Sequence, residues 1–350
     1  MELNSLISKC KCPENRFEFV VRTCMLDCLI ELFVQKYLQT YSKKHKYLVK
    51  LSLCNKNLNK IIMCKLLKYV YCKMSQVKHF DVRYGRENIQ YVCGVSTLDN
   101  IIFLHKFPNL KHLTLSEFNK HIDVKMLPPN LMYLSFGDKF NKRLKFGVLP
   151  STLKTLKFGY KFNQPVTKNI LPKELSALSF GVKFNRFIQK NVLPPQLTEL
   201  SFGYHFNKSI NNNVLPPHLT KLSLGYEFNH SIDDNTLPQS LTELYFSHEF
   251  NQLLNKNTLP KNLTVLSFGH DFNQSVAGIL PSGLKELSFG ICFDQSLIDE
   301  VLLLKNLIKL EIDHTYNQSE SKIMLNNMFI HKSKRRIWGG YVICTYTNDS

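Results

Sequence analysis

The sequence lacks a long apolar run: nowhere do about 18 apolar residues follow one another without interruption, as a membrane-spanning helix requires. Its most apolar segment, Val20–Val34, contains three charged residues. The first 20 residues mix charged and apolar positions, which is not the layout of a secretory signal. We therefore expect no membrane partner and a cytoplasmic location, with the nucleus as the alternative compartment.

The sequence also lacks the motifs of common enzyme classes. It contains no GxSxG, no P-loop, no HExxH and no GxGxxG. None of its 10 cysteines form a CxxC pair, and eight of them precede residue 94, unlike the even spacing of a disulfide-stapled secreted domain. We expect reduced, mostly packed thiols and predict no enzyme activity, no cofactor and no metal site.

Positive charge is abundant but unevenly distributed along the chain. The net charge is +18, yet residues 1–200 hold 33 Lys and Arg against 13 Asp and Glu, whereas residues 201–300 hold 5 against 10. The basic part raises the possibility of nucleic-acid binding. Because the acidic part would repel a long duplex, we rank nucleic acid well behind a protein partner.

A repeat of 22 residues dominates the sequence. Leu-Pro recurs at 127, 149, 171, 193, 215, 237 and 259, and Phe-Asn recurs at 140, 162, 184, 206, 228, 250 and 272. With Leu-Pro as positions 1 and 2, the consensus is LPxxLxxLxFGxxFNxxΦxxxx. One such unit is too short to bury its six apolar positions (1, 5, 8, 10, 14 and 18), so each coil must stack on the next.

Single positions of the repeat indicate local structure. Positions 8 and 10, such as Leu134 and Phe136, alternate as in a short strand. Pro at position 2 belongs in a turn, and Gly at position 11 is expected to end the strand and permit a tight bend. The pattern predicts a solenoid with one parallel strand per coil.

Asparagine at position 15 is interpreted as structural. A buried Asn in every coil can bond the backbone of its own turn and of the next coil, which forms a ladder. Its members are Asn141, Asn163, Asn185, Asn207, Asn229, Asn251 and Asn273.

The LxxLxF core resembles a leucine-rich repeat, and the 22-residue unit with Leu-Pro and Phe-Asn is similar to the FNIP repeat. The segment 162–166, Phe-Asn-Gln-Pro-Val, comes nearest to the motif that names that family. The resemblance covers residues 110–318 and implies a protein-binding solenoid of the kind found in amoebae and in giant viruses that infect them.

The remaining segments are expected to flank and cap the solenoid. We divide the chain into a leader (1–20), a helical block (21–75), the first coils with a cap (76–126), the repeat solenoid (127–318) and a closing cap (319–350). The predicted fold class is α+β, with a small helical block before the leucine-rich-repeat-like solenoid. The basic run 332–336 is interpreted as a turn before a capping strand, with a nuclear signal as the alternative.

The helical block resembles an F-box. Residues 48–62 are similar to the second half of that motif, whereas Met25-Leu26-Asp27 lacks the proline with which F-boxes usually open. The resemblance implies docking of a Skp-type linker subunit of a cullin ubiquitin ligase. The residues expected to form the docking surface or the core beneath it are Leu26, Leu29, Ile30, Phe33, Leu51, Leu53 and Leu58. The alternative is that the block only caps the solenoid.

Position 13 changes its charge in an ordered way along the array. It reads Lys139, Lys161, Lys183, His205, Glu227, Glu249 and Asp271. We call these seven residues the stripe. Stacking of like charges is unfavourable, so the stripe predicts a surface that orients a partner of opposite polarity. Copying of neighbouring repeats is the alternative explanation. At position 12, Tyr160, Tyr204, Tyr226, His248 and His270 predict an aromatic contact row.

Overall fold

The computed structural model describes residues 72–73, 90–313, 316, 329, 331–336 and 342–347. The chain divides into two compact units, Met1–Val70 and Tyr71–Ser350, and every element given below belongs to the second. The predicted F-box-like block lies outside the described residues. No helix of the described part is long and apolar enough to cross a membrane.

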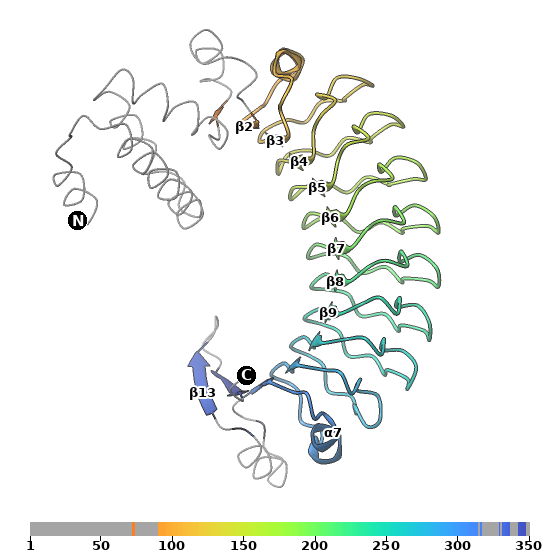
Figure 1. The fold of residues 1–350 in the computed structure, drawn as a ribbon, viewed down its shortest axis with the longest axis vertical. Coiled ribbons are helices and arrows are strands. Elements are labelled where there is room, and N and C mark those ends of the chain that lie inside the picture. The colour runs from red at the N-terminus through yellow and green to blue at the C-terminus, as the bar shows by residue number, and fades with distance from the viewer. Residues whose placement is uncertain are drawn as a thin grey trace, which may run out of the picture. The chain divides into compact units, whose positions relative to one another are not determined.

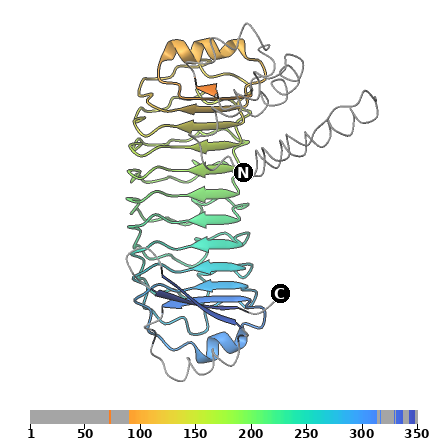
Figure 2. The ribbon, with the colours of Figure 1, turned by 90° about the vertical axis from the view of Figure 1, so that its left-hand side faces the viewer.

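Each coil contributes one short strand to a continuous sheet. The strands lie side by side along the inner side of the stack of coils (Figures 1 and 2). Neighbours pair in parallel, with residues one repeat apart in register, such as Leu156 with Leu178. The prediction of a solenoid with one parallel strand per coil is confirmed. The strands are β1 (Cys72–Lys73), β2 (Tyr91–Cys93), β3 (His112–Leu115), β4 (Tyr133–Phe136), β5 (Thr155–Lys157), β6 (Ala177–Ser179), β7 (Glu199–Ser201), β8 (Lys221–Ser223), β9 (Glu243–Tyr245), β10 (Val265–Ser267), β11 (Glu286–Ser288) and β12 (Lys309–Asp313).

Short helices and two antiparallel strands mark the ends of this sheet. Between β2 and β3 the chain forms α6 (Leu98–Phe103) and the 3-10 helix η2 (Leu104–Lys106), and between β11 and β12 it forms α7 (Ile298–Leu303). Thr97 caps α6, because its hydroxyl oxygen accepts from the backbone N–H of Asn100 at 3.3 Å.

The sheet continues beyond β12 with reversed direction. The strand β14 (Val342–Thr347) pairs with β12, and β13 (His331–Arg336) pairs with β14 at the edge, both antiparallel. The basic run 332–336 therefore lies in a strand, and our interpretation of it as a turn was wrong. Charged residues on an edge strand oppose pairing with further chains, which accounts for a basic sequence there.

The core consists of the six apolar positions of each repeat. Leucines at positions 5 and 8, such as Leu131 and Leu134, are fully buried, and position 1 is nearly so. Position 18 is buried in most coils, although Ile188 is half-buried. Because no coil could bury these side chains alone, the core depends on stacking.

Two ladders of phenylalanine rings run through this core. Rings at position 14, from Phe118 to Phe293, stack with centroids 6.0–6.3 Å apart. Rings at position 10 stack at 5.2–5.7 Å, and the two rings of one coil lie 3.8–4.2 Å apart. Leu224 replaces the ring once in the position-10 ladder. Such pairs add about 0.5–1.5 kcal/mol beyond the burial of their area.

Glycine at position 11 has a different role from the predicted one. None of these glycines has a positive φ, so a special bend is not the reason for them. A Cβ at Gly137, Gly159, Gly181, Gly203, Gly225, Gly269 or Gly290 would lie 1.6–2.3 Å from a carbonyl oxygen of the preceding coil. Glycine is favoured because two backbones approach each other here. Ser247 takes this position in one coil and donates a hydrogen bond to the carbonyl of Phe228.

In five successive coils a residue with left-handed backbone lies instead at position 21. Asn169, Asn191, Asn213 and Asn235 have φ values of 62–67°, and Gly147 has 78° at the equivalent place. Asparagine and glycine are the residues that adopt this conformation most readily. The recurrence of Asn or Gly at this position was a signal that our reading of the sequence did not use.

The position-15 asparagines bond from coil to coil. The side-chain oxygen of each accepts from the backbone N–H of the asparagine one repeat later, at 3.0–3.2 Å. These side chains are half-buried, and that of Asn229 is exposed, so the expectation of a buried ladder was wrong. The ladder lies at the surface and still satisfies one backbone donor per coil.

We predict that Gly203→Ala destabilises the solenoid. The new Cβ would lie 2.0 Å from the carbonyl oxygen of Gly181, and overpacking of this kind costs about 1–3 kcal/mol. Gly283→Ala is the matched control, because its nearest neighbour would lie at 3.7 Å. Urea denaturation followed by circular dichroism measures both, and equal loss of stability would contradict this explanation of the glycines.

Asn185→Ala is expected to leave the backbone N–H of Asn207 without its acceptor. An unsatisfied donor costs about 1–3 kcal/mol when shielded from water, and less where water reaches it. Amide hydrogen exchange should therefore become faster at residue 207. Asn211→Ala, at an exposed position, serves as the control and should leave that exchange rate unchanged.

Candidate protein-binding surface

The face of the sheet that points away from the core is formed by positions 7 and 9 of the repeat. Within each strand the central leucine is buried, and its two neighbours are half-buried or exposed. This alternation is the period of a strand with one face in a core. The face is therefore assembled from two residues per coil, at positions that vary more than the core positions do.

A groove of about 440 Å³ lies on this face over β5 to β9. Its base contains small side chains, among them Ala177, Ser179 and Ser201. Two larger residues, Lys157 in β5 and Tyr245 in β9, line the groove at the first and the last of its strands. The groove coincides with small residues at position 9 of three successive coils (Ser179, Ser201 and Ser223) and with Ala177 at position 7. The recurrence of serine at position 9 was visible in the sequence, but our sequence analysis looked for a binding surface on the solenoid only at positions 12 and 13.

One charged residue of the groove, Lys221, forms an ion pair with the next strand. Lys221 Nζ lies 2.5 Å from Glu243 Oε2, and the Tyr245 hydroxyl donates to the same oxygen at 3.0 Å. These hydrogen bonds raise the pKa of Lys221 and lower the pKa of Glu243, so both stay ionised. Burial, and then the bond to Glu243, raises the pKa of Tyr245. This end of the groove offers a fixed, nearly neutral polar cluster.

The stripe residues lie one per coil, on the turn that follows each strand. From Lys161 onward their backbone N–H groups donate to the carbonyl of position 12 in the preceding coil at 2.9–3.1 Å. The side chains of Lys139, Lys161 and Lys183 are exposed, whereas those from His205 onward are half-buried. The structure thus brings the seven residues into one column, as stacking requires.

Ion pairs relieve part of the repulsion along the stripe. Lys139 Nζ lies 2.5 Å from Glu117 Oε2, and this pair raises the pKa of Lys139. Where the sign of the stripe changes, His205 Nδ1 lies 2.8 Å from Glu227 Oε1. Lys183 Nζ lies 5.7 Å from the centroid of the Tyr160 ring, within the range of a cation–π contact.

Four of the five position-12 residues named above, all except Tyr160, form a stack of rings beside the acidic part of the stripe. Ring centroids of Tyr204 and Tyr226 lie 4.2 Å apart, those of Tyr226 and His248 4.1 Å, and those of His248 and His270 4.4 Å. Tyr204 is 43% exposed, so one end of the stack is open to a partner.

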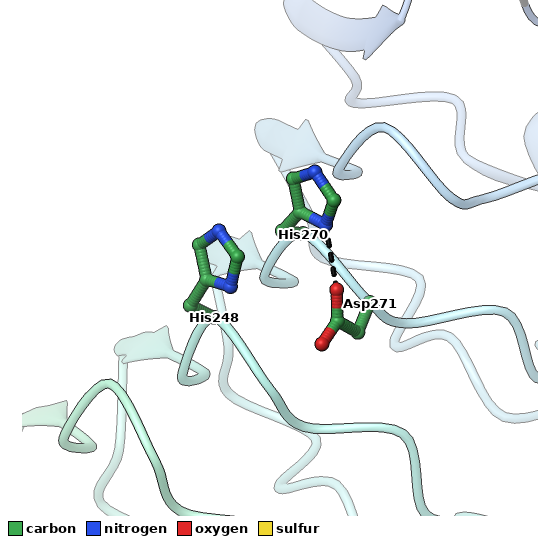
Figure 3. A group of neighbouring side chains, drawn as sticks. All are labelled: His248, His270 and Asp271. Atoms are coloured by element: carbon green, nitrogen blue, oxygen red, sulfur yellow. Dashed lines mark hydrogen bonds and ion pairs between the residues drawn. The ribbon is translucent and has the colours of Figure 1, made fainter. Parts of the chain in front are cut away.

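Two of these histidines form a cluster with the next stripe residue. His248, His270 and Asp271 each offer one ligand atom, and these atoms lie within 4.8 Å of one another (Figure 3). Our sequence analysis expected no metal site, because the cysteines form no CxxC pair and the chain contains no HExxH motif. The signal was their common position 12 in neighbouring repeats.

The F-box-like residues named above, Leu26 to Leu58, lie outside the described residues. Nothing in the described part bears on them.

Comparison with known proteins agrees with the solenoid. The model of the FNIP repeat matches residues 108–139, 118–161, 162–205, 206–249 and 250–292, more than half of the chain. A solved structure described as CroV588, a novel circular LRR protein, is similar with 38% identity and a TM-score of 0.54. The match covers 63% of this chain and 36% of that one, so this chain spans only about a third of that protein's length. No curated protein matches. The recurring Leu-Pro and Phe-Asn pairs, the stacked coils and these matches together place the chain in the FNIP repeat family.

Proposed function

We propose that the chain is a protein-binding scaffold that holds an elongated partner along its solenoid. The groove of about 440 Å³ over β5 to β9 is the observation that carries this proposal. Its small residues leave room for side chains of a partner, and the polar cluster at Glu243 offers fixed hydrogen-bonding groups. Stacked coils supply many such positions in a row, which suits an extended ligand.

The charge order along the stripe supports a defined direction for the partner. Three exposed lysines precede the sign change at His205, and three acidic residues follow it. Charges at the rim of an interface mainly fix orientation and association rate. A partner segment whose acidic part precedes or follows its basic part would bind in one orientation only.

The three lysines of the stripe are expected to contribute to partner binding. Peptides selected from a displayed library against the full chain should carry an acidic and a basic part. Exchange of Lys139, Lys161 and Lys183 for Glu should weaken the binding of these peptides at least about tenfold at low salt, and less at high salt, because salt screens exposed charges.

The control keeps the same change of net charge. Lys168, Lys190 and Lys256 are exposed on another turn of the coil, at position 20, and their exchange for Glu should leave affinity nearly unchanged. Equal losses in the two triple variants would show that net charge alone matters, and unchanged affinity in the stripe variant would exclude the stripe as an interface.

A finer proposal is that the scaffold recruits substrates to a cullin-type ubiquitin ligase in the cytoplasm. It rests on the sequence resemblance of residues 48–62 to an F-box and on the apolar spacing of residues 26–37. The helical block would dock a Skp-type linker subunit through a few buried anchors, while the solenoid holds the substrate. Otherwise the block only caps a solenoid that binds its partner directly.

One measurement distinguishes the ligase adaptor from the scaffold whose helical block is only a cap. The full chain should co-purify with a Skp-type linker protein, and a chain that begins at Tyr71 should not, because the boundary between the two compact units lies there. If both chains fold and neither binds the linker, the ligase connection is refuted and the binding scaffold remains.

A further inference from the structure

Nitrogen and oxygen donors of two neighbouring coils converge beside the acidic part of the stripe. His248 lies on the turn after β9, and His270 and Asp271 lie on the turn after β10. The two imidazole rings are stacked, with an interplanar angle of 10°, and the carboxylate of Asp271 lies beside them (Figure 3). The 22-residue register, and not a local motif, brings the three side chains together.

Hydrogen bonding leaves one nitrogen of this cluster unexplained. His270 Nδ1 lies 2.6 Å from Asp271 Oδ1, so these two groups are paired. His248 Nδ1 is shielded from solvent, yet it has no hydrogen-bond partner among the residues that the structure describes. A buried polar atom without a partner costs about 1–3 kcal/mol, and such atoms are rare in folded proteins. Ring stacking explains the position of His248 but leaves this atom unsatisfied.

The donor set matches a divalent transition metal. Two imidazoles and a carboxylate are ligands of zinc, whereas magnesium and calcium prefer oxygen alone. Zinc bonds of about 2.0 Å in a tetrahedron place ligand atoms roughly 3.3 Å apart, so the present spread of up to 4.8 Å requires only small side-chain rotations.

A sulfur donor lies next to this cluster. Cys292 lies in the next coil, with its sulfur 3.6 Å from His270 Nδ1, and is a further donor within reach. A thiol that binds a cation gives up its proton on binding.

We propose that His248, His270 and Asp271 form a binding site for a divalent transition-metal ion, zinc in the first place, that links two adjacent coils. The ion satisfies His248 Nδ1 and offsets the negative charge that Asp271 adds to the stripe. Three protein ligands leave a coordination position open to Cys292, to water or to a side chain of a bound protein. The site does not depend on the proposed groove function.

The test is a zinc titration of the reduced full chain in competition with a chromophoric chelator. Eight cysteines precede residue 94 and thiolates are zinc ligands, so the readout is a difference between chains. His248→Gln and Asp271→Asn should each bind one zinc equivalent fewer, or bind it at least about tenfold more weakly. Magnesium should not compete, because it prefers oxygen ligands.

Matched controls separate the site from a general effect on folding. His218 is exposed on another turn of the solenoid, and His218→Gln should retain every equivalent. Circular dichroism checks that each variant is folded, and Asp271→Asn is the safer of the two substitutions because the Asp271 side chain is 41% exposed, whereas the His248 ring is stacked between two others. If both folded variants bind zinc with the same stoichiometry and affinity as the unchanged chain, the proposed site does not exist.

Discussion

The fixed distance between neighbouring coils is the constraint on which the rest of the structure depends. Parallel strand pairing sets this distance along the sheet, and glycine at position 11 permits it where two backbones nearly touch, as at Gly203 and Gly181. Once each coil lies at that distance, identical side chains one repeat apart meet in register. The phenylalanine ladders, the asparagine ladder and the stack of rings at position 12 are all consequences of one spacing.

The solenoid could be predicted from the sequence because its signal is repeated in every coil. A strand of three residues such as Ala177–Ser179 would be invisible alone, but seven copies of Leu-Pro and Phe-Asn fix its place. The reason for the position-11 glycines was missed because an approach between two coils is not visible within one of them. The groove was missed for a related reason: it is a lack of side-chain volume, spread over serines and an alanine of different repeats.

Like charges in one column are tolerated in part because oppositely charged residues lie next to some of them in the same column, as Glu117 lies one repeat before Lys139. Lys139 pairs with Glu117, and the change of sign is bridged by His205 and Glu227. Exposed pairs of this kind contribute little to stability, generally below about 1 kcal/mol. The order of signs is therefore not explained by folding energy, and it is left to the two explanations that the sequence offers, orientation of a partner and copying of neighbouring repeats.

A solenoid of this kind builds sites from columns and not from motifs. The core positions must repeat, but each surface position can change in one coil without affecting the next, so a local site arises wherever two neighbouring coils carry complementary residues in the same column. His248 and His270 share a column in which the preceding coils carry tyrosine, and the same stacking geometry accepts both ring types. Because an imidazole adds nitrogen donors without disturbing the stack, substitutions at this position can give a contact surface a metal ligand while the fold stays unchanged. Recognition and metal chemistry can thus be acquired at the rim of the sheet independently of the leucine and phenylalanine core.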